Sequence, residues 1–313
     1  MDGQNLLHLT PSTEGIAQAA SLLAQGRLVA FPTETVYGLG ADARDGRAVA
    51  AIYEAKGRPS FNPLIVHLPD AETARSYGLW SDTAETLANA FWPGPLSLVL
   101  PLRDGHGLSS LVTAGLDSVA LRVPAHPAAQ SLLRAFGGPV AAPSANPSGR
   151  ISPTTAAHVR EGLADNLAAI LDAGGCSVGL ESTIVGLIET PRMLRPGGVS
   201  REDIDAVLSV PLLDATDGTI SAPGQLLSHY APRAAVRLDV RVPASDEVFL
   251  GFGDMPCDLN LSPAADLHEA AAQLFDQLHK LDATGKPIAV SPIPAYGLGV
   301  AINDRLKRAA APR

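Results

Sequence analysis

The feature that most constrains the fold is an alternation of short apolar runs with longer amphipathic segments, separated by glycine and proline. Residues 27–31 (RLVAF) and 62–68 (NPLIVHL) are apolar runs of strand length. Residues 12–25 and 45–57 place apolar side chains at helical spacing, and each segment closes on a glycine. Strands and helices that alternate in this way are typical of an α/β domain.

The alternation continues to about residue 208. Further strands are expected within residues 96–102, 118–124, 138–145, 168–174 and 182–188. A capping box at Asp82 and Glu85 indicates one helix start, and Ser200 can cap another. Pro127 and Pro153 occupy positions where the first residue of a helix tolerates proline. The first two hundred residues therefore predict one α/β domain.

The pattern lapses over residues 209–230 and then resumes. Strands are expected in 234–242, 246–253 and 286–293, and helices in 263–282 and 299–310. The predicted division is a first domain at 1–208, a linker at 209–230 and a small α/β domain at 231–313. A linker of this length is unusual inside a compact domain, and such loops are commonly functional. One hypothesis is that residues 221–230 fold over a pocket as a lid.

Composition narrows the class of protein. The chain has 313 residues, a formal charge of −9 and two cysteines without metal-site spacing. The acidic balance argues against a large nucleic-acid-binding face. The N-terminus has no basic start followed by a long apolar run, and no run reaches membrane-span length. We therefore expect a soluble cytoplasmic protein.

Several standard catalytic signatures are absent from the sequence. It contains no GxxxxGK[ST] loop, no GxSxG elbow and no HExxH motif. The glycine pairs at 38–43 and 251–256 both lack the third glycine of a dinucleotide fingerprint. No covalent nucleophile is indicated, so an enzyme of this sequence would act by binding and positioning.

Three segments carry candidate binding residues, each with a structural alternative. FPTETVYGLG (31–40) is either a turn or the floor of a pocket. In KGRPSFNPL (56–64), Lys56 and Arg58 either complement a helix dipole or hold phosphates. APSANPSGRISPT (142–154) is either a capped surface loop or an anion site beside a helix that starts at Ser152 and Pro153.

The fourth candidate is Arg122, which lies inside an apolar run and needs an acidic partner or a ligand carboxylate. His67 in LIVHL is either a satisfied core histidine or a ligand contact. Ser182 and Thr183 open another strand. Arg195 precedes a Pro-Gly turn, where it is either solvated or bound to a ligand.

Together these segments resemble the Sua5/YrdC/YciO family, and in particular its two-domain Sua5 type. The matching motifs are FPTETVYGLG, KGRPSFNPL, LRVP, APSANPSG, ESTIV and LRPG. The family signature of K-x-R followed by S-x-N corresponds to Lys56-Arg58 and Ser144-Asn146. Residues 221–233 and the C-terminal residues resemble the Sua5-type extension. The resemblance implies a YrdC-like twisted mixed sheet with a cleft, then a small Rossmann-like domain.

The resemblance also implies an activity, that of an L-threonylcarbamoyladenylate synthase. This nucleotidyltransferase makes threonylcarbamoyl-AMP and pyrophosphate from L-threonine, bicarbonate and ATP with Mg²⁺. Other proteins then transfer the threonylcarbamoyl group to adenosine 37 of tRNA (t6A modification), so direct tRNA binding is expected to be weak or absent. Lys56 and Arg58 would be catalytic. The implied threonine site is Thr35, His67, Arg122, Ala142 and Ser182. The implied ATP site is Lys56, Arg58, Asn62, Ser118, Ser144, Asn146, Ser152, Arg195 and Tyr230, and no residues are implied as metal ligands.

Three other functions remain open at this point. One is a carbamoyl-adenylate former, like the domain within hydrogenase-maturation carbamoyltransferases, although the chain lacks their acylphosphatase-like and zinc-finger segments. Another is an RNA-binding module, against which the acidic charge argues. The third is a non-catalytic regulator that retains the pocket.

Overall fold

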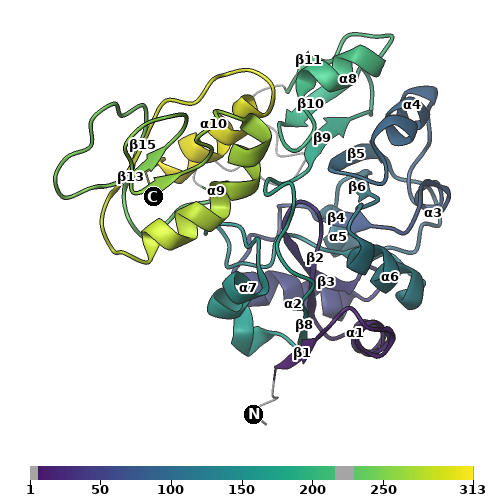
Figure 1. Ribbon diagram of the computed structural model, residues 1–313. Coiled ribbons are helices and arrows are strands. Elements are labelled where there is room, and N and C mark those ends of the chain that lie inside the picture. The colour runs from purple at the N-terminus through teal and green to yellow at the C-terminus, as the bar shows by residue number, and fades with distance from the viewer. Residues whose placement is uncertain (1–5, 216–228, 313) are drawn as a thin grey trace.

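The computed structural model describes residues 6–215 and 229–312, and two sheets organise this part of the chain (Figure 1). The large sheet has eleven described strands in the order β1-β8-β2-β3-β7-β4-β6-β5-β9-β10-β11. They are β1 (Leu7–Leu9), β2 (Val29–Pro32), β3 (Tyr37–Asp42), β4 (Ile65–His67), β5 (Leu96–Pro101), β6 (Ser118–Arg122), β7 (Val140–Ala141), β8 (Ala169–Leu171), β9 (Thr183–Gly186), β10 (Arg192–Arg195) and β11 (Leu213–Asp214). Parallel and antiparallel pairs both occur, so the predicted mixed α/β sheet is confirmed.

Helices cover the large sheet on two faces. They are α1 (Thr13–Ala24), α2 (Gly46–Lys56), α3 (Ala71–Ala74), α4 (Asp82–Phe91), α5 (Ser110–Thr113), α6 (Pro127–Phe136), α7 (Ala156–Leu163), the short 3₁₀ helix η1 (Ala164–Asn166) and α8 (Arg201–Val207). Val29 and Phe31 of β2 pack in one apolar cluster with α1 and α6. Ala30, between them, packs in another cluster with α2 and α4. Because alternate strand residues face opposite sides, the two clusters lie on opposite faces of the sheet.

The second sheet is small and entirely parallel. Its order is β12-β15-β13-β14, with β12 (Val236–Arg237), β13 (Val248–Gly251), β14 (Leu259–Asn260) and β15 (Ile288–Val290). Helices α9 (Leu267–Asp282) and α10 (Leu298–Ala309) pack beside it (Figure 1). The apolar cluster around Phe275 of α9 also contains Val36, Ile151 and Leu180. The C-terminal elements therefore share a core with the elements that precede them.

Three helix starts differ from the sequence prediction. Ser81, not the Asp82–Glu85 box, caps α4, because the Ser81 hydroxyl accepts the Ala84 amide. The Glu85 carboxylate instead accepts from the Trp80 indole. Helix α7 begins at Ala156 behind the cap Thr155, three residues after the predicted start at Pro153.

Helix α9 begins at Leu267 behind the cap Asp266, four residues after the predicted start at 263. The predicted starts at Pro127 and Ser200 are confirmed. Pro127 is the first residue of α6, and Ser200 caps α8 through the Asp203 amide. Of the predicted linker, residues 216–228 lie outside the described ranges, and with them most of the predicted lid. Leu213–Asp214, which the prediction places in the linker, forms β11 beside β10. Among the helices of the described ranges, none combines the length and apolar character needed to cross a bilayer.

Candidate active site

One pocket collects most of the predicted site residues. It lies where the loop between β2 and β3 meets the ends of β4, β6, β7 and β10, and it encloses about 560 Å³ of empty space including its open mouth. The predicted residues that line it are Thr35, Arg58, His67, Arg122, Ala142, Ser144, Ser182, Arg195 and Tyr230. The lining residues that were not predicted are Thr33, Val36, Gly38, Ile65, Pro143, Glu181 and His229.

The segment 31–40 ends β2, turns at residues 33–36 and begins β3, and the turn itself lines the pocket, so both readings of this segment apply. Thr33 organises the connection, because its hydroxyl donates to the Val36 carbonyl at 2.7 Å and accepts the Thr35 and Val36 amides. The chain then continues as β3. A Cβ on Gly40 would lie 2.8 Å from the Phe31 ring, and one on Gly38 would lie 3.2 Å from the Ala142 Cβ. The glycines therefore allow β3 to pack closely against its neighbours.

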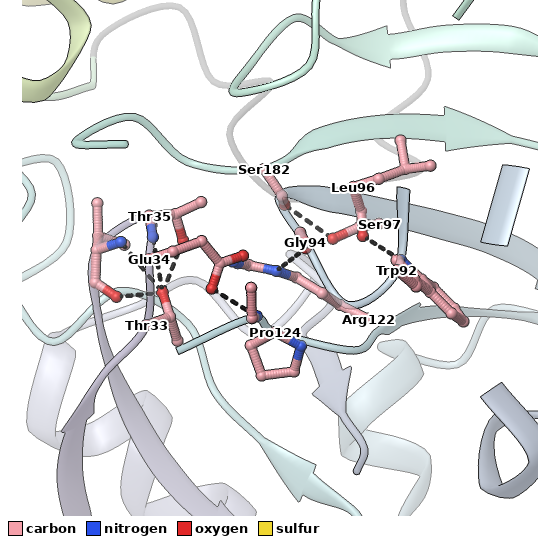
Figure 2. A network of polar contacts seen from close by, with 12 residues as sticks. Thr33, Glu34, Thr35, Trp92, Gly94, Leu96, Ser97, Arg122, Pro124 and Ser182 are labelled. Atoms are coloured by element: carbon pink, nitrogen blue, oxygen red, sulfur yellow. Dashed lines mark hydrogen bonds and ion pairs between the residues drawn. The ribbon is translucent and has the colours of Figure 1, made fainter. Parts of the chain in front are cut away.

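Arg122 is held at the pocket wall by two partners. Its Nη2 donates to Glu34 Oε1 at 2.6 Å, and its Nε donates to the Gly94 carbonyl at 3.2 Å. Figure 2 shows the guanidinium extended between these two groups. Glu34 also accepts the Ala125 amide. The acidic partner considered for Arg122 thus exists, and Arg122 still lines the pocket.

His67 is a neutral imidazole beside Arg122. Burial, and then the charge of Arg122, lower the pKa of His67 to about 3. The carbonyl of Ile65, 3.3 Å from Nδ1, can only accept, so Nδ1 carries the proton. Nε2 is therefore an acceptor available at the pocket wall.

Lys56 is the last residue of α2, and its ammonium holds the loop that contains Ser144 and Asn146. Its Nζ donates to the Ser144 carbonyl at 2.6 Å and the Asn146 carbonyl at 2.5 Å. Gly57 ends the helix in the left-handed region at φ 58° and leads to Arg58. Lys56 is 4% exposed and Arg58 9% exposed. The K-x-R and S-x-N motifs are therefore physically joined.

The buried cations favour an anionic ligand. Burial, and then repulsion from Arg58, lower the pKa of Lys56. Burial and Arg195 lower the pKa of Arg58 to about 10. Arg58 donates to the carbonyls of Asn62 and Pro63, which orient it without neutralising its charge. An anion placed here would reduce the electrostatic cost of these cations.

The opposite wall comes from β9, β10 and the segment at 229–230. Arg195 donates to the Ser182 carbonyl at 2.9 Å and to its hydroxyl at 3.2 Å. The Ser182 hydroxyl also bonds with Ser97 at 2.8 Å (Figure 2). Tyr230 is 1% exposed and has a left-handed backbone at φ 60°. Its hydroxyl has no hydrogen-bond partner in the described part of the chain.

Five predicted residues do not line this pocket: Lys56, Asn62, Ser118, Asn146 and Ser152. Ser118 begins β6, four residues before Arg122 at its other end. Ser152 is buried and donates to Glu181 at 2.5 Å. Asn62 is 1% exposed, and neither atom of its amide group has a partner within the described ranges. A buried amide of this kind usually meets a ligand or water.

Sequence reasoning missed two carboxylates at the site: Glu181, which lines the pocket, and Glu34, which holds the lining residue Arg122. Both pair with arginine, Glu34 with Arg122 and Glu181 with Arg305. The available signal was an acidic residue inside each binding motif, TET and EST. In the described ranges, no group of three or more His, Cys, Asp or Glu side chains could hold a metal ion.

Fold and site together define an α/β protein with a cationic small-molecule pocket, and comparison with known proteins gives its family. Residues 21–197 match the family model Sua5_yciO_yrdC, described as "Telomere recombination". Residues 199–311 match Sua5_C, "Threonylcarbamoyl-AMP synthase, C-terminal domain". The chain belongs to the Sua5/YrdC/YciO family, with the Sua5-type C-terminal domain.

Relatives match over nearly the whole chain. A Bacillus subtilis protein named threonylcarbamoyl-AMP synthase is 41% identical, covering 97% of this chain and 95% of its own. A Pyrococcus abyssi protein of the same name is 40% identical, covering 93% and 92%. The solved structure of P. abyssi Sua5 complexed with L-threonine superposes with a TM-score of 0.89 at 37% identity, covering 97% of each chain.

Proposed function

We propose that this protein is a threonylcarbamoyl-AMP synthase that uses L-threonine, bicarbonate and ATP. The observation that carries the proposal is one pocket that combines the buried cations Arg58 and Arg195 with the polar wall of Thr35, His67 and Arg122. A cationic end suits phosphates, and a small polar end suits an amino acid. The two relatives that are named threonylcarbamoyl-AMP synthase support this assignment.

L-Threonine would occupy the end formed by Thr35, His67, Arg122, Ala142 and Ser182. Arg122 uses Nε and Nη2 in the protein, and no hydrogen bond in the described ranges uses its Nη1. Nη1 could therefore donate to the threonine carboxylate. His67 Nε2 could accept from the threonine nitrogen or hydroxyl, because the ring is neutral.

ATP would occupy the cationic end. Arg58 and Arg195 would contact phosphate oxygens, and Ser144 lies in the loop that Lys56 holds. Asn62 and Tyr230 each have a buried polar atom without a partner in the described ranges, as expected for residues that meet a ligand. Asn146, Ser118 and Ser152 complete the proposed ATP set, with Asn146 and Ser152 acting through their contacts to Lys56 and Glu181.

The reaction needs no protein nucleophile. The threonine amine first forms a C–N bond to the carbon of bicarbonate, a C–O bond of bicarbonate breaks, and water leaves with the amine proton to give N-carboxy-threonine. One oxygen of this carbamate attacks the α-phosphorus of ATP, the bond from that phosphorus to the bridging oxygen breaks, and pyrophosphate leaves with the bond electrons. Lys56, Arg58 and Arg195 would stabilise the negative charge of the phosphates during this step, through their fixed positions and without forming a covalent bond. Glu181 in the pocket and Glu34 behind Arg122 are both paired with arginine, so Mg²⁺ would enter with ATP as part of the substrate.

The domain division and the cellular fate of the product follow from the same function. Residues 1–208 would form the catalytic domain, 209–230 a linker and 231–313 the C-terminal domain. The product would pass in the cytoplasm to proteins that modify adenosine 37 of tRNA. An acidic protein of charge −9 suits a small-molecule product better than direct tRNA binding.

Pyrophosphate release tests the proposal. Purified protein with MgATP should release pyrophosphate only when L-threonine and bicarbonate are both present. L-Serine, which lacks the methyl group, and L-valine, which lacks the hydroxyl, are the informative substitutes. Release without threonine, or none from folded protein, would contradict the proposal and favour a carbamoyl-adenylate or binding function.

The variant Arg58→Gln should lose activity while remaining folded. Removal of a charge-assisted contact predicts a loss of about tenfold to a hundredfold in kcat/KM for ATP. The matched control is Arg75→Gln, because Arg75 is a surface arginine that pairs with Glu85 far from the pocket residues. Equal activity of the two variants would place the phosphates elsewhere.

A further inference from the structure

A buried arginine of the C-terminal helix lies directly behind the pocket. Arg305, in α10, is 0% exposed, the largest fully buried side chain of the described residues. It does not line the pocket itself. Its Nε donates to Glu181 Oε2 at 2.8 Å across 124 residues of sequence, and its Nη1 donates to Asp304.

Glu181 connects this arginine to the pocket. It lines the pocket, accepts from Ser152 at 2.5 Å through one carboxylate oxygen and from Arg305 through the other. Burial raises the pKa of Glu181, but the charges of Arg305 and Arg195 outweigh burial and hold that pKa below its ordinary value. Glu181 is therefore a carboxylate beside the cations that would face phosphates.

Arg305 also contacts a second pocket residue. Its guanidinium lies over the Tyr230 ring at 5.1 Å from the centroid. Tyr230 stacks further against Phe275 of α9, with ring centroids 5.6 Å apart. Nη2 of Arg305 has no hydrogen-bond partner in the described ranges. One side chain thus fixes both the acid and the tyrosine on this wall.

We infer that Arg305 is a positioning residue for the nucleotide end of the pocket, acting through Glu181 and Tyr230. This inference rests on the proposed function for the identity of the nucleotide. Arg305 and Ser152, neither of which lines the pocket, each bind one oxygen of the Glu181 carboxylate and hold its charge. Without Arg305, the Glu181 charge would turn to the pocket cations and compete with the phosphates.

A purely structural ion pair would behave differently. Loss of one partner of a buried pair destabilises a protein, and loss of both can be nearly neutral. Such a pair would change the melting temperature, while the folded fraction would keep its ordinary ATP affinity. ATP affinity in folded protein therefore separates the two roles.

The test compares Arg305→Met, Arg305→Lys, Glu181→Gln and the double variant Arg305→Met/Glu181→Gln. Lys307→Met is the control, because Lys307 is an exposed cation on the same helix. Binding of a non-hydrolysable ATP analogue is measured by calorimetry below the melting temperature of each variant. KM for ATP, KM for threonine and kcat are measured in parallel.

Arg305→Met should weaken analogue binding and raise KM for ATP about tenfold, the effect of one charged competitor for a phosphate contact. The double variant should recover most of that affinity, and Arg305→Lys should lie between wild type and Arg305→Met. KM for threonine should change less. If Arg305→Met does not fold, the Lys variant carries the comparison.

Two results would overturn the inference: wild-type ATP affinity in Arg305→Met or Arg305→Lys with only a lower melting temperature, or a double variant that binds no better than Arg305→Met. Wild-type protein that binds the analogue but releases no pyrophosphate with threonine would refute the proposed function and leave the Arg305 result intact. Wild-type protein that does not bind the analogue would refute both.

Discussion

At the scale of single residues, the site contains buried cations, and burial makes their charge unfavourable. Lys56 and Arg58 are buried, and backbone carbonyls rather than carboxylates accept their hydrogen bonds. Carbonyl dipoles orient a cation but do not cancel its charge. The site is therefore organised before a ligand binds. An anionic ligand would interact favourably with these cations, because no carboxylate in the described part of the chain accepts their hydrogen bonds.

Close packing at Gly40 gives a stability prediction. A methyl group there would lie 2.8 Å from the Phe31 ring and 3.1 Å from Val140 Cγ1, so Gly40→Ala should lower the free energy of unfolding by about 1–3 kcal/mol. Gly175→Ala is the control, because the nearest atom to its Cβ is 3.9 Å away and its backbone is not left-handed. Urea unfolding measures both, and equal stability of the two variants would contradict the packing argument.

The pocket residues were identified mainly by the family resemblance, because the local sequence alone left a structural alternative open for each motif. Thr35, His67, Arg122 and Ser182, which the resemblance assigns to the threonine site, all line the pocket. Arg305 could not be predicted in the same way. Its role depends on Glu181, 124 residues away, and its local sequence reads only as one cation in an amphipathic helix.

At the scale of elements, a residue predicted from the local sequence to cap a helix does so unless another hydrogen-bond partner competes for its side chain. Ser200 caps α8 as predicted: its hydroxyl accepts the Asp203 amide and donates to the Asp203 carboxylate, and both groups belong to the helix itself. Ser152 does not start α7, because its hydroxyl donates to Glu181. Periodicity thus predicts that an element exists, while tertiary hydrogen bonds decide where it begins.

Two histidines stack where α7 meets α9. His158 and His279 have ring centroids 3.9 Å apart, and His158 also lies 3.6 Å from Asp276. His279 Nε2 donates to the Ser152 carbonyl. The positive charge of Lys280 also lowers the pKa of His158. Burial lowers the pKa of His279, and the negative charges of Glu161 and Asp282 partly oppose this shift.

This stack should make stability depend on pH. Burial, and then His279, lower the pKa of His158 to about 4, below its unfolded value of about 6.5. Between these values the unfolded chain binds a proton that the folded chain does not, so stability should fall as pH decreases from about 6.5 towards 4.

The variant His158→Phe keeps an aromatic ring without a titrating group. Urea unfolding at pH 7.5 and pH 5 should show a smaller loss of stability in this variant than in wild type. Burial also lowers the pKa values of His67, His126, His229 and His279, and these histidines account for the part of the loss that remains. An unchanged pH dependence would show that His158 contributes nothing to it and would assign the effect to the other histidines.

At the scale of the whole molecule, the C-terminal elements pack against the elements that precede them. Figure 1 shows α9 and α10 beside the large sheet, and the shared apolar cluster joins Phe275 to Val36, Ile151 and Leu180. Tyr230 and Arg305 add polar contacts at the same boundary. The sequence predicted two α/β units but not this shared core, because patterning reveals which residues are apolar and not which distant segments they meet.

A chain that ends at residue 208 should therefore lose most of its synthesis activity. It would lack Tyr230 and Arg305 and would expose Val36, Ile151 and Leu180 to water. Full-length protein and the truncated chain would be compared for melting temperature and pyrophosphate release. Full activity in the truncated chain would show that the pocket functions without its C-terminal wall.

The most direct test of the central claim is the identity of the product. The protein would be incubated with MgATP, L-threonine and ¹³C-labelled bicarbonate, and the products analysed by mass spectrometry. We predict threonylcarbamoyl-AMP with one labelled carbon, formed in equal amount to pyrophosphate and strongly reduced in Arg58→Gln. Pyrophosphate release without a labelled threonine adduct would contradict the account.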